Sequence, residues 1–186
     1  ELDADIISDY DCILDACIKG KIELFNFLIS YKPEIRNLES CILTLIDRYD
    51  QFKKHKKPNK KLINDCIEMV EILIKQYDFN VDNNRTICKS IQILSIEFLE
   101  LFEKYSANFD AVNYNYSRMV SKEFIPIFHF LEDKGCTFRN FNSHYSCQYN
   151  YNSKNYKKVI YFIFHHGHYV IFQNYLEEFI LRMKTM

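Results

Sequence analysis

Three histidines stand within four residues of one another near the end of the chain, in the stretch HHGH at positions 165–168. Imidazole is a common zinc ligand, and a structural zinc site needs four ligands in tetrahedral geometry. His144 and Cys147 lie upstream and would be the nearest additional ligands. Partly cationic histidines are also favourable in the last turn of a helix. We follow this second interpretation and expect no bound metal or other cofactor, with the zinc site as the alternative.

No other group of residues in the chain forms a catalytic motif. A cysteine nucleophile needs a nearby base and a stabilised thiolate, and only Cys147 lies close to a histidine, His144, in the sequence. A glycine-rich phosphate loop, a paired-carboxylate motif and a serine elbow are all absent. We therefore expect that the protein is not an enzyme.

Lysine is concentrated in one short segment, residues 50–63, which reads DQFKKHKKPNKKLI. Lysine occupies six of the nine positions 53–61, and such a cluster attracts phosphates or an acidic protein. Solvated loops also accumulate lysine for solubility. No aromatic stacking platform accompanies them, and the whole chain has a net charge of −1. We expect that the chain does not bind nucleic acid, and an acidic protein partner remains the alternative for this segment.

Tyrosine and asparagine dominate a second long segment, residues 139–157. Loops of this length in compact domains are either functional or disordered. Tyr145 and Tyr149 are candidates for partner contacts because tyrosine is favoured at interfaces. The same bias runs through the whole chain, so drift explains the segment equally well.

Composition favours a helical protein of one domain. The 186 residues include only three glycines and three prolines, whereas antiparallel β-folds need many tight turns. Seven scattered cysteines with no C-x-x-C spacing indicate free thiols, which predicts an intracellular, reducing compartment. No apolar run reaches the length of a membrane span, so we expect no membrane association.

The chain repeats itself. A shift of 74 residues aligns CILDACIKGKIELFNFLISYKPEI (12–35) with TICKSIQILSIEFLELFEKYSANF, and VIYFIFHHGHYVIFQNYLEEF (159–179) matches as well. Each copy predicts a short helix opening at a capping residue, such as Asp11 or Ser40, and a turn at Gly20 or Gly167. A second amphipathic helix follows. Such pairs bury their apolar faces by stacking into a solenoid.

Two further copies are less regular. CILTLIDRY (41–49) and IEMVEILIKQYDFNV (67–81) match the two halves of the unit, and FIPIFHFLEDKGCTF (124–138) belongs to another. The expected units span residues 9–38, 39–83, 84–112, 113–141 and 157–186, with inserts at 50–63 and 139–157. Residues 1–8 look like the tail of a preceding or capping repeat, which suggests a longer array, whereas the array is expected to end after Phe179.

The unit resembles the ankyrin repeat. ILDACIKGKIELFNFLI carries the opening, the Ala16–Cys17 pair, the Gly20 turn and the helix, and HHGHYVIFQNYL carries the turn and helix again. GCTF (135–138) stands where the family has glycine-alanine-aspartate-valine, while the family's threonine-proline dipeptide is absent. The resemblance implies an all-α, ankyrin-like helix-turn-helix solenoid of about five irregular repeats. Together with the composition, it suggests a large DNA virus, of giant-virus or poxvirus type, or an AT-rich protist as the source.

The resemblance implies an adaptor or scaffold that binds a protein through the concave face and finger loops, and no small molecule. A self-associating structural component is the alternative. Ankyrin arrays present their first helices on the concave face, which in this chain also includes Ile18. The candidate contacts on these helices are Asp15, Lys19, Asp47, Arg48, Lys89, Gln92, Phe162, His165 and His166.

Overall fold

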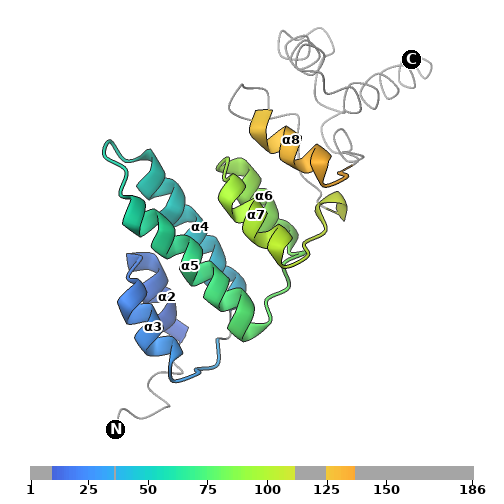
Figure 1. Ribbon diagram of the computed structural model, residues 1–186. Coiled ribbons are helices and arrows are strands. Elements are labelled where there is room, and N and C mark those ends of the chain that lie inside the picture. Colours follow the sequence, from blue (N-terminus) through green and yellow to red (C-terminus); the bar gives the residue numbers. More distant parts are fainter. Residues whose placement is uncertain (1–9, 36, 112–124, 137–186) are drawn as a thin grey trace, which may run out of the picture. The chain divides into compact units, whose positions relative to one another are not determined.

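The computed structural model describes residues 10–35, 37–111 and 125–136, and these residues are helical (Figure 1). They form seven α-helices and one short 3-10 helix, and no strand occurs among them. The prediction of an all-α chain is confirmed for this described part. The chain divides into two compact units, residues 1–93 with 97–107 and residues 94–96 with 108–186.

The helices of the first unit follow one another in three pairs, and the described part of the second unit is short. The first pair is α2 (Tyr10–Lys19) and α3 (Ile22–Ile29), and the second is α4 (Leu38–Lys54) and α5 (Lys60–Tyr77). The third is α6 (Asn84–Gln92) and α7 (Ile96–Lys104), whose first residue falls in the second unit. The 3-10 helix η1 (Phe109–Ala111) and α8 (Ile125–Asp133) belong to the second unit.

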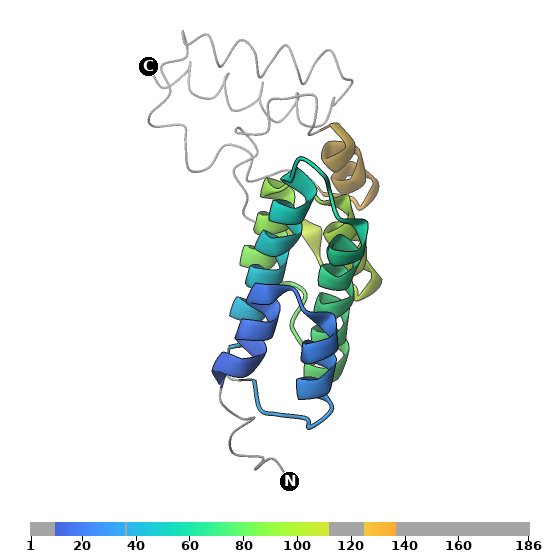
Figure 2. The same ribbon diagram turned by 90° about the vertical axis from the view of Figure 1, so that its left-hand side faces the viewer.

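The first unit is built of two layers of helices. The first helices of the pairs lie side by side, with α4 in contact with both α2 and α6, while α3 packs on α5 in the other layer. Figure 2 shows α2 and α4 on one side and α3 and α5 on the other. Each pair therefore contributes one helix to each layer, and the apolar faces of both layers meet between them.

The long helices α4 and α5 form the centre of the core. Ile42, Leu45 and Ile46 of α4 are fully buried, as are Met69 and Leu73 of α5. These residues recur at the spacing of one helical face, so each helix presents a continuous apolar stripe to its neighbours.

An aromatic cluster joins the second pair to the third. The Phe98 ring of α7 meets the Tyr49 ring of α4 edge-on, with centroids 4.9 Å apart, and stacks on Phe102 at 6.4 Å. All three rings are fully buried. Aromatic pairs in these geometries add stability beyond the apolar area that they bury.

Asparagine caps three of the helices. Asn37 accepts a hydrogen bond from the Ser40 backbone N–H at the start of α4, and Asn59 and Asn83 cap α5 and α6 in the same way. A short side-chain oxygen satisfies amide groups that have no partner within the helix. The predicted caps were wrong: Asp11 lies inside α2 and Ser40 inside α4. A cap belongs one turn before the apolar pattern begins, and Asn37 occupies that place.

The lysine-rich segment does not form a loop. Residues 50–54 continue α4 and residues 60–63 begin α5, so only residues 55–59 connect the two helices. The extra residues therefore lengthen this helix pair at one end. Lysine has a high helix propensity, which explains why a charged stretch of this kind remains helical.

The turn at Gly20 has the conformation that the sequence predicts. Gly20 has φ +61°, in the left-handed region that glycine adopts without steric cost, and its N–H donates to the Cys17 carbonyl at 3.1 Å. Lys21 N–H donates to the Ala16 carbonyl at 3.2 Å. These bonds close the end of α2 and turn the chain directly into α3.

We expect that Gly20→Ala destabilises the fold by about 1 kcal/mol more than Gly135→Ala, through overpacking against the Phe52 ring. A β-carbon on Gly20 would lie 3.1 Å from the Phe52 ring, whereas one on Gly135 meets nothing within 4 Å. Both glycines have positive φ, so the backbone strain is common to both variants and only Gly20 adds a steric clash. Urea unfolding of the two variants measures the difference. Equal losses of stability would show that the Phe52 ring moves aside freely.

The first and third helix pairs have the same backbone geometry at an offset of 74 residues. Gly20 and Leu94, between the two helices of each pair, have φ values of +61° and +59°. Lys32 and Ser106, after the second helices, have φ values of +51° and +67°. Their N–H groups donate to equivalent carbonyls, those of Ile29 and Glu103, at 2.8 Å in both cases. The turn and the end of the second helix therefore have the same backbone conformation in both pairs, at equivalent residues. Only the turn of the first pair contains glycine.

Candidate partner-binding surface

Six of the residues predicted to contact a partner lie in the described part of the chain, and they share one layer. Asp15 and Lys19 belong to α2, Asp47 and Arg48 to α4, and Lys89 and Gln92 to α6. Because α4 contacts both α2 and α6, these positions come together on neighbouring helices. We call the surface formed by these six residues and Ile18 the first-helix surface.

Polar contacts connect the three helices across this surface. Arg48 Nε donates to the backbone carbonyl of Ile18, which joins α4 to α2, and Arg48 Nη1 donates to Gln51 Oε1 at 2.7 Å. Asp47 Oδ1 lies 2.5 Å from Lys89 Nζ, which joins α4 to α6. Charged side chains of α4 therefore contact both neighbouring helices of this surface.

A second ion pair lies within α2, between Lys19 and Asp15 one turn apart. Pairs with this spacing stabilise a helix only slightly, and exposed pairs are weak because water competes for both charges. The side chains of Asp15, Lys19 and Asp47 remain about half exposed. They can therefore exchange their present partners for groups on another protein at small energetic cost.

Ile18 is the apolar residue of the first-helix surface. Its side chain is 41% exposed, and it lies next to Lys19 in the sequence, on the helix whose carbonyl Arg48 binds. An exposed aliphatic side chain with charged groups around it is the usual anatomy of an interface anchor, with an apolar centre and a polar rim. Its signal in the sequence is an apolar residue on the polar side of an amphipathic helix.

Two of the buried cysteines in the core of this unit, Cys17 and Cys66, are unsuited to nucleophilic chemistry. Cys17 of α2, Cys41 of α4 and Cys66 of α5 are fully buried. A hydrogen bond with Cys41, together with burial, raises the pKa of the Cys17 thiol. Burial, together with the charge of Asp65, raises the pKa of Cys66 to about 12. Since the thiolate is the reactive form, Cys17 and Cys66 provide no nucleophile at neutral pH.

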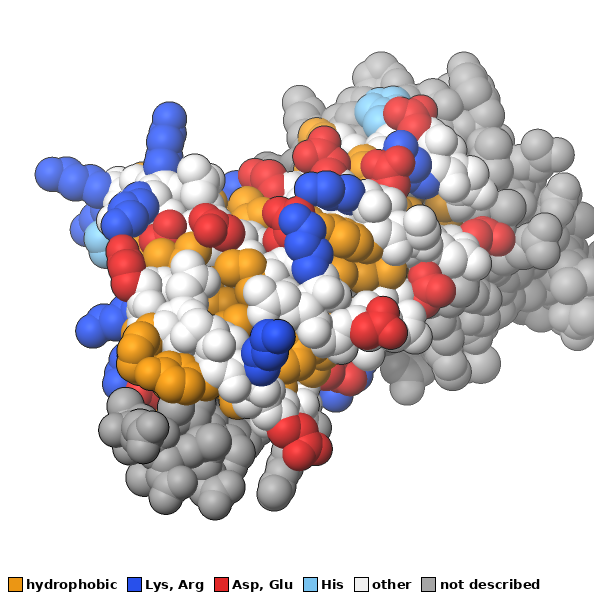
Figure 3. Space-filling model, turned by 60° about the horizontal axis from the view of Figure 1, so that its bottom comes forward, with side chains coloured by type: hydrophobic (Ala, Val, Ile, Leu, Met, Phe, Trp, Pro, Cys, Tyr) orange, Lys and Arg blue, Asp and Glu red, His pale blue; other side chains and the backbone are white. Residues whose placement is uncertain are grey.

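The lysine-rich connection between α4 and α5 forms a basic tip. Lys53, Lys54 and Lys61 pair with Glu97, Asp50 and Glu23. The amino groups of Lys56, Lys57 and Lys60 form no ion pair with any residue that the structure describes. In Figure 3 the lysine side chains project at the left-hand edge beside a histidine.

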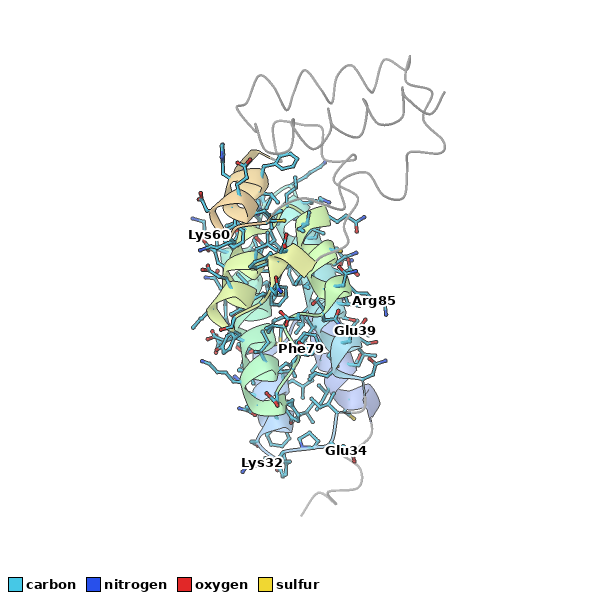
Figure 4. The ribbon with its side chains drawn as sticks, turned by 90° about the vertical axis from the view of Figure 1, so that its right-hand side faces the viewer. Lys32, Glu34, Glu39, Lys60, Phe79 and Arg85 are labelled. Atoms are coloured by element: carbon cyan, nitrogen blue, oxygen red, sulfur yellow. The ribbon has the colours of Figure 1, made fainter. Side chains whose placement is uncertain are left out.

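An ion pair at the other end of α4 was not predicted from the sequence. Arg85 Nη1 lies 2.7 Å from Glu39 Oε1, and Asn83 Nδ2 donates to Glu39 Oε2 at 3.1 Å (Figure 4). Glu39 is the second residue of α4 and Arg85 the second residue of α6, so the contact ties the starts of two neighbouring first helices together. The residues are far apart in the sequence, and no local pattern pairs them.

The remaining predicted contacts lie outside the described residues. They are Phe162, His165, His166, Tyr145 and Tyr149, and the possible zinc ligands His144, Cys147 and His168 lie there too. Within residues 10–35, 37–111 and 125–136, no group of three or more potential ligands is arranged to hold a metal ion. Among the same residues, no helix is both long enough and apolar enough to cross a bilayer.

Comparison with known proteins identifies no relative of this chain. No family model matches the sequence, and no curated protein or solved structure is significantly similar to it. The first-helix surface is therefore interpreted from its own geometry and chemistry.

Proposed function

We propose that the chain is a divergent ankyrin-like array of helix pairs that acts as a protein–protein interaction module. The proposal is carried by the backbone geometry shared by the first and third pairs, from the turn at Gly20 and Leu94 to the helix ends at Lys32 and Ser106. Stacked units with a common geometry form one continuous surface, and repeat proteins use such extended surfaces for binding.

The composition of the first-helix surface supports a protein as the partner. It contains charges of both signs, Asp15 and Asp47 with Lys19 and Arg48, and one exposed aliphatic side chain, Ile18. A nucleic acid would instead favour a patch of one sign with stacking aromatic groups. Mixed charge around an apolar anchor complements the surface of another folded protein.

The three helices hold the surface rigid. The packing of α4 against α2 and α6, together with the Arg48 bond to the Ile18 carbonyl, fixes the helices relative to one another before any partner arrives. A preorganised surface loses less conformational entropy on binding, so more of the contact energy appears as affinity.

Affinity capture tests this function. The purified chain is immobilised and exposed to a lysate of the cells that produce it, and retained proteins are quantified by mass spectrometry. We expect that Ile18→Asp lowers retention of the partner at least ~10-fold, because a charge replaces the apolar anchor. The captured protein is then purified, and its Kd is measured for the original chain and the variant.

Glu68→Lys provides the matched control, since it alters a charge on α5 in the other layer and leaves the first-helix surface unchanged. Retention by this variant should equal that of the original chain. If no retained protein distinguishes Ile18→Asp from Glu68→Lys while both variants unfold at the same denaturant concentration as the original, the proposed function is wrong.

A further inference from the structure

A second exposed surface lies in the other layer, on α3. Leu24, Phe27 and Tyr31 are 38%, 48% and 45% exposed, and they recur at the spacing of one helical face. The rings of Phe27 and Tyr31 contact each other edge-on, with centroids 5.3 Å apart. We call these three residues the α3 stripe. Leu24 and Phe27 lie in α3, and Tyr31 lies two residues beyond its last residue, Ile29.

The positions of Leu24 and Phe27 are buried or half-buried in α5, α7 and α8, whereas the position of Tyr31 is half-buried at the end of α5 and after α7, and exposed after α8. The four helices can be aligned on the residue with positive φ that follows each of them: Lys32, Asp78, Ser106 and Gly135. In this alignment Leu24 corresponds to Val70 of α5, Phe98 of α7 and Ile127 of α8, all three of which are almost completely buried. Phe27 corresponds to the buried Leu73 and Leu101 and to the half-buried Phe130.

In α7 these positions face the preceding helix pair. Phe98 packs against Tyr49 of α4, and Tyr105, the counterpart of Tyr31, donates its hydroxyl to Glu71 of α5 at 2.9 Å. The α3 stripe is therefore a stacking face of the same kind as the one that α7 uses.

The charges around the α3 stripe fit a second copy of the stripe. Residues 24–31, LFNFLISY, contain no charged side chain. Lys21 and Glu23 precede this segment, and Lys32 and Glu34 follow it, and all four are exposed. Figure 4 shows Lys32 and Glu34 in the segment after α3. In an antiparallel pair of α3 helices, Lys21 would lie opposite Glu34 of the second copy. Glu23, whose exposed pair with Lys61 of its own chain spans 3.3 Å, would lie opposite Lys32.

We propose that the α3 stripe is the interface of a two-fold symmetric dimer of this chain, with the two α3 helices antiparallel. Leu24 of one copy packs on Tyr31 of the other, the two Phe27 rings lie near the symmetry axis, and opposite charges meet at both ends. A two-fold interface is self-complementary by definition, and it is the commonest arrangement in soluble homo-oligomers. The aromatic rings supply the contact area that homodimer interfaces use.

Sedimentation velocity over a concentration series tests the dimer. The original chain should change from monomer to dimer as its concentration rises, whereas Phe27→Glu should raise the dimer Kd at least ~10-fold by placing two carboxylates near the axis. Glu68→Lys, on α5, serves as the control and should leave the dimer Kd unchanged.

A charge exchange tests the antiparallel arrangement independently of the apolar stripe. Glu23→Lys and Lys32→Glu should each weaken the dimer by placing like charges together, and the double variant should recover most of the original Kd. A chain that stays monomeric at every concentration would overturn the proposal. So would a dimer that Phe27→Glu leaves unchanged, or a double variant that is weaker than both single ones.

Discussion

Replacing Phe98 with alanine is expected to lower the free energy of unfolding by about 3–5 kcal/mol, the range for removing a fully buried phenylalanine. Phe98 is fully buried, and its ring contacts Tyr49 of the preceding helix pair and Phe102 of its own helix. The variant loses the transfer free energy of the ring and leaves a cavity between two helix pairs, because the long α4 cannot collapse into it. Denaturant unfolding followed by circular dichroism measures the loss.

Leu24→Ala is the matched control, since Leu24 occupies the same position in α3 as Phe98 does in α7. Its side chain is exposed, so the monomer should lose no more than about 1 kcal/mol, as expected for a surface substitution. The comparison is made at a protein concentration at which the chain is monomeric. Similar losses for the two variants would contradict the claim that equivalent positions differ only in whether another pair covers them.

Replacing Glu71 with glutamine should destabilise the chain by about 1–2 kcal/mol at pH 7, after allowance for solvent screening of the exposed lysines. Glu71 Oε1 accepts hydrogen bonds from Lys104 at 2.7 Å and Tyr105 at 2.9 Å, and it pairs with Lys75 at 2.9 Å. Hydrogen bonds from Lys104 and Lys75, with a further one from Tyr105, lower the pKa of Glu71 from 4.5 to about 2.

The sign of the pH dependence follows from the lowered pKa. Glu71 has a lower pKa in the folded chain than in the unfolded chain, so ionisation of its carboxylate stabilises the fold. This contribution to the free energy of unfolding is complete above the unfolded pKa of 4.5. The contribution falls as the pH drops toward 2, and the difference between the original chain and Glu71→Gln should disappear there. A constant difference from pH 7 to pH 2 would exclude the ionised carboxylate as its origin.

The helical architecture was predictable because each helix carries its apolar residues on one face. The turn at Gly20 was predictable for a different reason, since glycine tolerates positive φ at no steric cost. The equivalent turn at Leu94 has the same conformation without glycine. A sequence pattern based on glycine does not detect such a turn.

Long-range polar contacts and helix boundaries were less predictable. The Glu39–Arg85 pair and the hydrogen bonds of Glu71 join residues on different helices, so they depend on how the pairs stack. Residues 50–63 looked like a loop because lysine is common in loops, yet its helix propensity extends α4 and α5. Composition alone does not distinguish an exposed helix from an exposed loop.

The first-helix surface was predicted from the resemblance to the ankyrin repeat, in which the first helices share one face. That reasoning brought Asp15, Asp47 and Lys89 to one layer, where α2, α4 and α6 lie side by side. It did not show that Asp47 and Lys89 pair with each other, since a pairing depends on the rotation of both helices. The exposure of the α3 stripe was also not predictable, because its residues follow the same apolar pattern as their counterparts in the other helices.

Site-specific photocrosslinking tests the proposed function most directly. A photoreactive phenylalanine is placed at Ile18 or Gln92 on the first-helix surface, and at Glu68 or Glu100 on the other layer, in cells that produce the chain. We predict that both first-helix positions crosslink to the same protein and that the Glu68 and Glu100 positions do not. Crosslinks from Glu68 and Glu100 that equal those from Ile18 and Gln92, or no adduct from the latter two, would contradict a partner-binding first-helix surface.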